Sequence, residues 1–207
     1  MRRLDYEISD AKSDQIDADL LVVPTSTKTL RAGSDPTLSA LSEATEIELR
    51  ELLDEESFAA APLETLVVRP VSGVHAERLL FVGIGDVDDQ EAHAIRHASA
   101  KAARLARGMR APKVAFAPPR SPLPDERIAR ELVCGFSFGA YEFDRYRSRR
   151  EGDFDGFDSL VLLGADEATA EATAKARAPD SATSTARDHV NDPASPLPPE
   201  PMAPPPK

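Results

Sequence analysis

The placement of apolar residues constrains the fold of this chain more than any other feature of its sequence. Short runs rich in Val and Leu alternate with longer amphipathic stretches, which is the pattern of an α/β domain. Five runs are nearly continuously apolar and predict strands covered on both faces: 19–24, 65–70, 78–83, 113–117 and 159–164. Apolar and polar residues alternate over positions 4–8 instead, which predicts an edge strand with one face exposed to solvent. We expect the first run to end at Pro24, because proline cannot donate a ladder hydrogen bond.

The stretches between these runs have helical periodicity. Leucines from Leu38 to Leu53 recur on one helical stripe, so a helix is predicted around 37–54. Gly135 and Gly139 lie one turn apart within a second predicted helix, where they would let another backbone approach closely. The remaining predicted helices are 88–107, 125–146 (the one with the two glycines), 166–177, and a piece that begins near 180 or 181 after a proline.

These elements divide the chain into three parts. Residues 1–165 form the predicted α/β domain, and residues 166–192 form a linker helix region. Residues 193–207 form a tail that we expect to be disordered or polyproline-like, because eight of the fourteen residues from Pro193 to Pro206 are proline.

The charge and cysteine content exclude several classes of function. A formal net charge of −11 opposes binding to nucleic acid, which depends on cations that neutralise phosphates. The basic run from Arg145 to Arg150 is interpreted as a solvated helix end rather than a phosphate or partner patch. The lone Cys134 lies among apolar neighbours and is expected to be a small buried side chain in a reducing compartment. No run is long enough to span a membrane and no signal peptide is evident, so we expect a soluble cytoplasmic protein.

Three segments resemble one known family, and they occur in that family's order. Arg78-Leu79-Leu80-Phe81-Val82-Gly83-Ile84-Gly85 is similar to its strand and glycine turn, and residues 135–146 resemble its G-x-x-L-x-x-Y-x-F-x-x-Y helix. Residues 186–193 read A-R-D-H-V-N-D-P and are similar to the family's A-R-D-L-V-N-x-P. The family is that of the leucyl aminopeptidases, and the matched region is its N-terminal domain. His189, Ser195 and Pro198 depart from the pattern, which has Leu, Asn and Thr there.

The resemblance implies a macro-domain-like fold, a mixed sheet flanked by helices. It also implies that a complete family enzyme releases N-terminal residues from peptides with two divalent metals such as zinc or manganese. The family's catalytic N-T-D-A-E-G-R stretch does not occur in this sequence, so no catalytic residue or metal ligand is carried over and we expect no cofactor in this chain. The resemblance therefore predicts a non-catalytic domain with a structural or assembly role. A separate catalytic-domain chain or a second copy is the expected partner, contacted by Arg187, Asp188, Val190 and Asn191.

Several residue patterns invite a catalytic or metal-site interpretation, and each has a simpler one. The acid-rich segments 86–89 and 151–158 lack the order of a calcium loop and are interpreted as solvated loops. His93 and His97 would share a helix face, but no general-base Glu or third ligand is nearby, which favours a surface pair. Ser137 fits G-x-S-x-G by letters but lies inside a predicted helix, so it is not a nucleophile at a strand-to-helix elbow.

Gly83 and Gly85 follow a predicted strand and precede a helix, a place where backbone N–H groups bind phosphate. Because a third glycine is missing, a plain turn is the favoured interpretation. The alternative function is a stand-alone macro-type module that binds a nucleotide, ADP-ribose or another protein.

Overall fold

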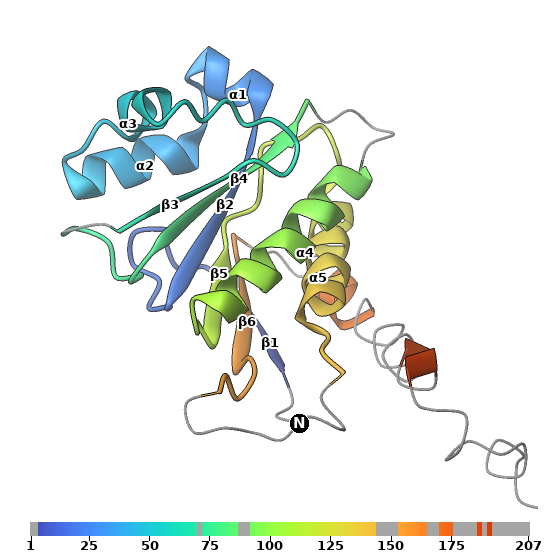
Figure 1. Ribbon diagram of the computed structural model, residues 1–207. Helices are drawn as coiled ribbons and strands as arrows, with labels where there is room; N and C mark the ends of the chain where they lie inside the picture. The colour runs from blue at the N-terminus through green and yellow to red at the C-terminus, as the bar shows by residue number, and fades with distance from the viewer. Residues whose placement is uncertain are drawn as a thin grey trace, which may run out of the picture.

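The computed structural model describes residues 4–69, 72–86, 92–143, 153–164, 170–175, 186–187 and 190–191. A six-stranded sheet in the order β1-β6-β5-β2-β4-β3 forms its centre, with helices on both faces (Figure 1). The strands are β1 (Asp5–Ser9), β2 (Leu20–Ser26), β3 (Thr65–Val68), β4 (Leu79–Gly85), β5 (Lys113–Phe116) and β6 (Ser159–Leu163). All six segments that the sequence pattern assigned to strands are confirmed, and so is the mixed α/β fold.

The sheet is mixed because a single pairing, β3 with β4, is antiparallel. The other pairings are parallel, and each parallel step from β4 to β5 and from β5 to β6 needs a crossover helix. The helices are α1 (Thr27–Ala32), α2 (Pro36–Thr45), α3 (Leu49–Glu55), α4 (Ala92–Gly108) and α5 (Asp125–Ala140). Helices α4 and α5 make the two crossovers.

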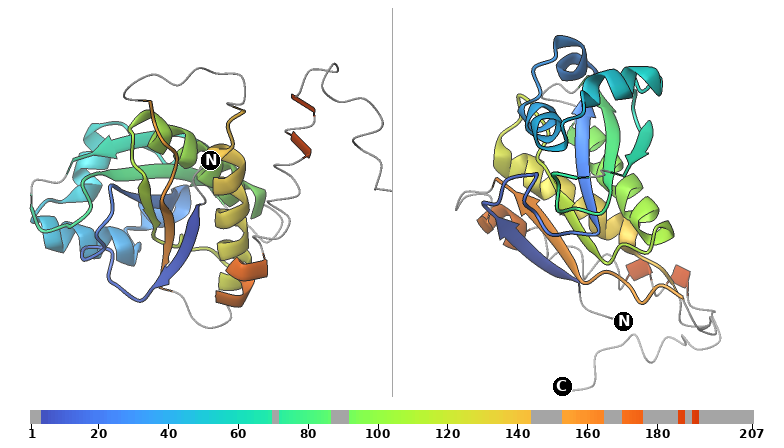
Figure 2. Two further views of the ribbon diagram at one scale, coloured as in Figure 1. Left: turned by 90° about the horizontal axis from the view of Figure 1, so that it is seen from below. Right: turned by 90° about the vertical axis from the view of Figure 1, so that its left-hand side faces the viewer.

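Alternation along the strands builds two separate cores. Even-numbered residues such as Leu20, Val22 and Leu80 pack with α4 and α5, while odd-numbered residues such as Leu21 and Phe81 pack with α1, α2 and α3. The helices α1–α3 and the pair α4–α5 therefore lie on opposite faces of the sheet, as Figure 2 shows. This explains why the inner strands read as continuous apolar runs.

Pro24 does not end β2, contrary to the sequence-based expectation, since the strand continues to Ser26. In a parallel sheet the N–H and C=O of one residue point to the same neighbouring strand. The Val22 carbonyl accepts a hydrogen bond from the Ala117 amide, so Val22 faces β5. Pro24, two residues further on, faces the same side of β2, but the pairing of β2 with β5 ends at Val22. The missing N–H therefore removes no ladder hydrogen bond.

The run 65–70 was expected to be covered on both faces, and this is wrong. It forms β3, which ends at Val68 and lies at the edge of the sheet, and Val67 is 41% exposed. Strand β1 lies at the other edge with an alternating, half-exposed pattern, as expected.

The helix predicted around 37–54 is two helices, α2 and α3, and α1 was not predicted. Glu46 ends α2 in the left-handed region with φ 56°, and the Ser42 hydroxyl accepts from the Leu49 amide at the start of α3. The leucine stripe runs through this break because both helices bury their leucines in the same core. Helix α5 ends at Ala140 rather than 146, and Tyr141 is extended with ψ 130°.

Helices α4 and α5 pack closely through glycine, which confirms the expectation for this pair. A Cβ placed on Gly135 would lie 2.2 Å from the Arg96 carbonyl oxygen, and one on Gly139 would lie 2.2 Å from that of Ala100. Cys134 is half-buried against the same core rather than fully buried.

Residues 170–175, inside the predicted helix 166–177, are helical. The basic run 145–150, the helix start near 180 and the tail 193–207 lie outside the described residues. Among the helices that the structure describes, none is long and apolar enough to cross a membrane.

Candidate functional site

The C-terminal end of α5 carries a cluster of aromatic and polar side chains. The Arg187 guanidinium lies 3.9 Å from the ring centroid of Tyr141 and 4.6 Å from that of Phe138. Its Nη1 also donates to the Phe138 carbonyl at 3.2 Å, and the Asn191 side-chain amide donates to the Tyr141 hydroxyl at 3.3 Å. Residues about fifty positions apart in the sequence are thus joined at one place.

Much of this cluster is exposed and apolar. Val190 is 83% exposed and Phe138 is 49% exposed, the two highest values among the exposed large hydrophobic side chains of the described chain. We call this cluster the α5 docking surface, and it consists of Phe138, Tyr141, Arg187, Val190 and Asn191. Exposed apolar residues beside an arginine stacked on aromatic rings are typical of protein–protein contacts.

Helix α5 holds this surface on a rigid base. Glu131, only 9% exposed, accepts two hydrogen bonds from Arg96 on α4, at 2.6 and 3.1 Å. Arg107 donates to the Ala140 carbonyl at the end of α5, and the Tyr6 hydroxyl on β1 lies 2.6 Å from the Ser137 hydroxyl. The helix end is therefore tied to α4 and to the sheet.

The structure brings together three of the four residues that the sequence singled out for a partner contact. Arg187, Val190 and Asn191 lie at the α5 docking surface, and Asp188 is outside the described residues. The sequence analysis included Phe138 and Tyr141 only as part of the segment 135–146 that resembles a family helix, and it did not predict a partner contact for them. The shorter α5 could not be foreseen from the periodicity, which is why their place at its end was missed.

Gly83 and Gly85 lie inside β4, at its carboxyl end, rather than in a turn after the strand as the sequence suggested, and their amides are already bonded. The Gly83 N–H donates to Glu64 O at 2.8 Å, and the Gly85 N–H donates to Ala60 O at 3.0 Å. A Cβ on Gly83 would lie 2.0 Å from the Ala61 carbonyl oxygen. Close packing against residues 60–64 thus accounts for glycine at position 83, and Gly85 has φ +65°.

The other sequence candidates do not assemble into a catalytic or metal centre. His93 and His97 are exposed on α4 with ring centroids 5.7 Å apart. Among the described residues, no three His, Cys, Asp or Glu side chains are grouped so that they could hold a metal ion. The two metals implied for the family enzyme therefore find no fitting donor set in this part of the chain. Ser137 lies inside α5, as expected.

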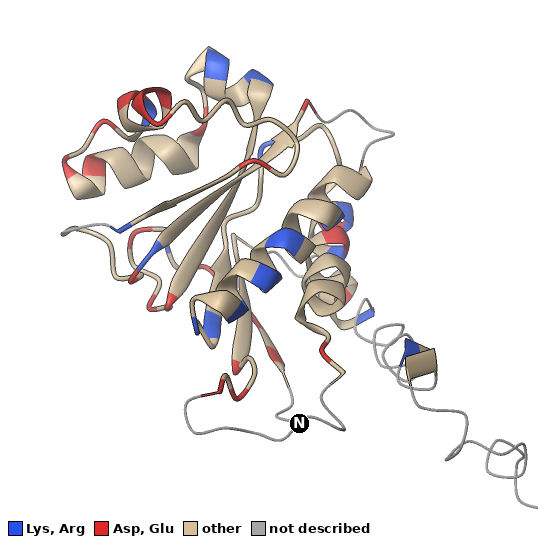
Figure 3. Cartoon of the chain, viewed as in Figure 1, with Lys and Arg blue, Asp and Glu red and all other residues tan. Residues whose placement is uncertain are grey.

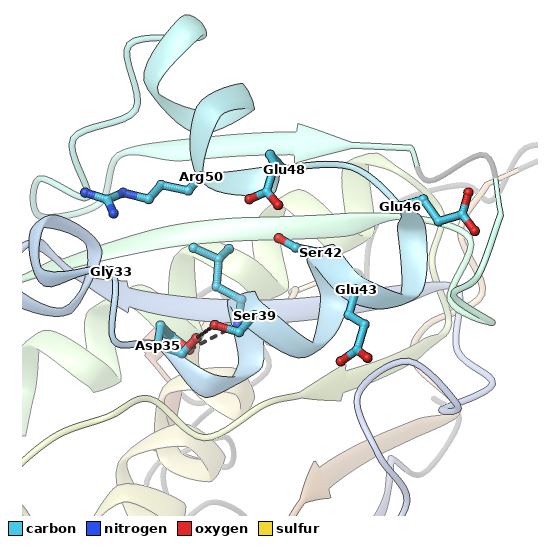
Figure 4. A pocket seen from close by; sticks show the side chains of 9 residues that line it. Gly33, Asp35, Ser39, Ser42, Glu43, Glu46, Glu48 and Arg50 are labelled. Atoms are coloured by element: carbon cyan, nitrogen blue, oxygen red, sulfur yellow. Dashed lines mark hydrogen bonds between the residues drawn. The ribbon is translucent and has the colours of Figure 1, made fainter.

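A polar pocket of about 570 Å³ lies between α1, α2 and α3 (Figure 4). Asp35 caps α2 by accepting from the Thr37 and Leu38 amides, and Arg50 donates to the Arg31 carbonyl at 3.2 Å. Glu43, Glu46 and Glu48 also line it. Its polar groups serve as helix caps or remain as exposed carboxylates, so the pocket offers no nucleophile paired with a base.

Comparisons with known proteins identify a matching family. Residues 22–150 match the cytosol aminopeptidase family's N-terminal domain. A probable cytosol aminopeptidase of Syntrophotalea carbinolica is 29% identical over 175 residues, which cover 81% of this chain and 35% of that protein. One of Alkaliphilus oremlandii is 30% identical over 164 residues, which cover 75% of this chain and 32% of that protein. The chain thus spans about a third of the length of these curated relatives.

Solved structures show the same fold. A mutant of tomato leucine aminopeptidase superposes with a TM-score of 0.80 at 21% identity, covering 98% of this chain and 41% of that chain. A macrodomain mutant from Oceanobacillus iheyensis superposes with a TM-score of 0.60 at 11% identity, covering 82% of this chain and 88% of that chain. At these identities the likeness concerns the fold alone.

Proposed function

The chain belongs to the cytosol aminopeptidase family through that family's N-terminal domain, and from this premise we propose that it is a non-catalytic docking domain. Its α5 docking surface receives the catalytic portion of an aminopeptidase, carried by the same protein or by another chain. The catalytic portion supplies two divalent metals, zinc or manganese, and releases N-terminal residues from peptides. The single observation that supports this role is the seating of Arg187 and Asn191 on the end of α5 beside the exposed Val190.

The physical argument starts from the exposed apolar groups. Val190 and Phe138 leave apolar area in water, and burying such area is worth about 25 cal/mol per Å². The side chains of Arg187 and Tyr141 have an apolar body and a polar tip, so they are stable both when the surface is exposed to water and when a partner covers it. The contacts of Arg187 with Phe138 and Tyr141 fix its side chain before docking, which lowers the ordering cost of association.

We propose docking ahead of macro-type binding of a nucleotide or ADP-ribose. Phosphate binding at Gly83 and Gly85, at the end of β4, needs free N–H groups, and the amides of both glycines donate to backbone carbonyls.

The absence of catalysis is tested with the purified chain and a leucine amide substrate. With manganese or zinc added, we expect no release of leucine above the metal-only blank, because the described residues contain no cluster of three potential metal ligands. Release that scales with the concentration of the chain would contradict a non-catalytic role.

Docking is tested by binding to the part of the Alkaliphilus oremlandii relative that lies beyond its match to this chain. This probe is used once far-UV circular dichroism has shown that it is folded. The double variant Phe138→Ser/Val190→Ser should weaken binding about tenfold or more, the effect of losing about 1.4 kcal/mol of contact energy.

A matched control uses two exposed hydrophobic residues far from this surface. Leu63 and Val67, 45% and 41% exposed, lie in and beside the edge strand β3. The variant Leu63→Ser/Val67→Ser should bind the catalytic portion as the wild type does. Equal weakening by both double variants would mean that the α5 docking surface has no special part in binding.

A further inference from the structure

Helix α4 exposes a purely basic face although the chain is acidic. Residues 92–108 contain no Asp or Glu, while the chain as a whole has a formal net charge of −11. His93, His97, Lys101 and Arg104 recur at steps of three and four residues, so they lie on one stripe of the helix. His93, His97 and Arg104 are exposed and Lys101 is half-exposed. Figure 3 shows the cationic bands along α4.

The cations within this stripe are not neutralised inside the molecule. Neighbouring arginines are paired, Arg96 with Glu131 on α5 and Arg107 with Glu142 just beyond its end. Lys101 and Arg104, by contrast, form no ion pair with any residue that the structure describes. The centre of the stripe is therefore free to attract an anionic surface.

The opposite face of the molecule carries the complementary charge. Seven exposed acidic side chains lie on and between α2 and α3: Glu43, Glu46, Glu48, Glu51, Asp54, Glu55 and Glu56. The one cation among them, Arg50, extends towards Gly33 and donates to the Arg31 carbonyl. The pocket of about 570 Å³ beside Glu43, Glu46 and Glu48 has room for long side chains. In Figure 3 the acidic positions of α2 and α3, coloured red, lie on the far side of the sheet from α4.

The two charged faces cannot meet within one molecule, because α4 packs in one core and α2–α3 in the other. We propose that the basic stripe of α4 docks on the acidic α2–α3 face of a second copy of this chain. Such a head-to-tail contact uses two different surfaces, so it builds rings or open chains rather than closed dimers. The surfaces involved are separate from the α5 docking surface.

A second copy fits better than another anionic partner. Each copy of the chain carries one basic face and one acidic face, so the acidic partner is always present at the same concentration as the basic stripe. The pocket lies within the acidic face. Nucleic acid would meet the same stripe but would be repelled by the acidic remainder of the surface.

The test is sedimentation velocity of the full chain at about 100 µM. In salt of about 20 mM, where charges interact over more than about 20 Å, we expect a weight-average mass that exceeds the monomer's 22.3 kDa and rises with concentration. In salt of about 0.5 M the mass should fall to that of the monomer, because screening shortens this range to a few ångströms. A mass of 22.3 kDa at every concentration in low salt would overturn the proposal.

Charge reversal identifies the two faces. The variants Lys101→Glu/Arg104→Glu and Glu46→Lys/Glu48→Lys should each be monomeric alone, and an equimolar mixture of the two should associate again. The control Lys12→Glu/Arg69→Glu changes the net charge as the first variant does, at exposed sites on neither face, and should associate like the wild type. Thermal unfolding checks that each variant is folded, and the salt dependence of the wild type does not depend on any variant.

Three results would contradict head-to-tail pairing. The first is that both charge-reversal variants still associate on their own. The second is that the equimolar mixture of the two variants stays monomeric. The third is that the wild type is monomeric and its α4 stripe binds a duplex DNA probe instead.

Discussion

At the scale of single residues, glycine decides how closely α4 and α5 approach. Gly135 and Gly139 face the α4 backbone, at the Arg96 and Ala100 carbonyls. The sequence predicted this close approach from their spacing of one turn, because few other roles explain two glycines inside a helix. It could not predict which element they face, since that depends on the order of strands in the sheet.

The variant Gly139→Ala should lower the free energy of unfolding by about 1–3 kcal/mol, because its Cβ would lie 2.2 Å from a backbone oxygen that has no room to move. This loss should outweigh the gain of about 1 kcal/mol in helix propensity. Urea titration measures the difference. Gly108→Ala is the control, since a Cβ there meets nothing within 4 Å, and it should leave stability unchanged or raise it. If both variants gained stability, the tight contact would not exist.

At the scale of elements, the sequence predicted every strand that the structure describes and missed how two helices end. Apolar runs predict strands well because the buried faces alternate between two cores. The break between α2 and α3 was missed because Glu46 adopts φ 56° without a glycine to signal it. The early end of α5 was missed because the apolar spacing continues through Phe143 and Tyr146. That end matters for the proposed function, since Tyr141, the extended residue that follows the helix, stacks against Arg187.

The variant Arg187→Ala should speed hydrogen exchange at the Val190 and Asn191 amides by about two- to fivefold. An exposed cation–π contact is worth about 0.5–1 kcal/mol, and this is the stabilisation that the variant removes. The thermal midpoint of the whole chain should not change, because Arg187 lies outside both cores. Arg130→Ala, at an exposed arginine earlier on α5, serves as the control. Unchanged exchange in the Arg187 variant would show that these residues are held by other contacts.

At the scale of the whole molecule, the resemblance of three ordered segments predicted the fold, and the sheet order and the likeness to macrodomain structures confirm it. The site was predicted in part. Arg187 and Asn191 were singled out, but their contacts with Phe138 and Tyr141 at the end of α5 were not, because about fifty residues separate the two segments in the sequence. The segregation of charge between α4 and the α2–α3 face was not predicted from the sequence. The helix predicted at 88–107 includes the acidic Asp88, Asp89 and Glu91, whereas α4 runs from Ala92 to Gly108 and contains no acid. Its position opposite the acidic helices follows from the alternation along the strands.

The most direct measurement is the hydrogen-exchange footprint of the catalytic portion on this chain. Exchange of the free chain is compared with that of the chain saturated with the folded catalytic part of the Alkaliphilus oremlandii relative. A docking domain of the kind proposed should gain protection at the last turn of α5 and at residues 186–191, with no change at β3. Protection confined to α2–α3 or to β3, or no footprint at saturating partner, would contradict it.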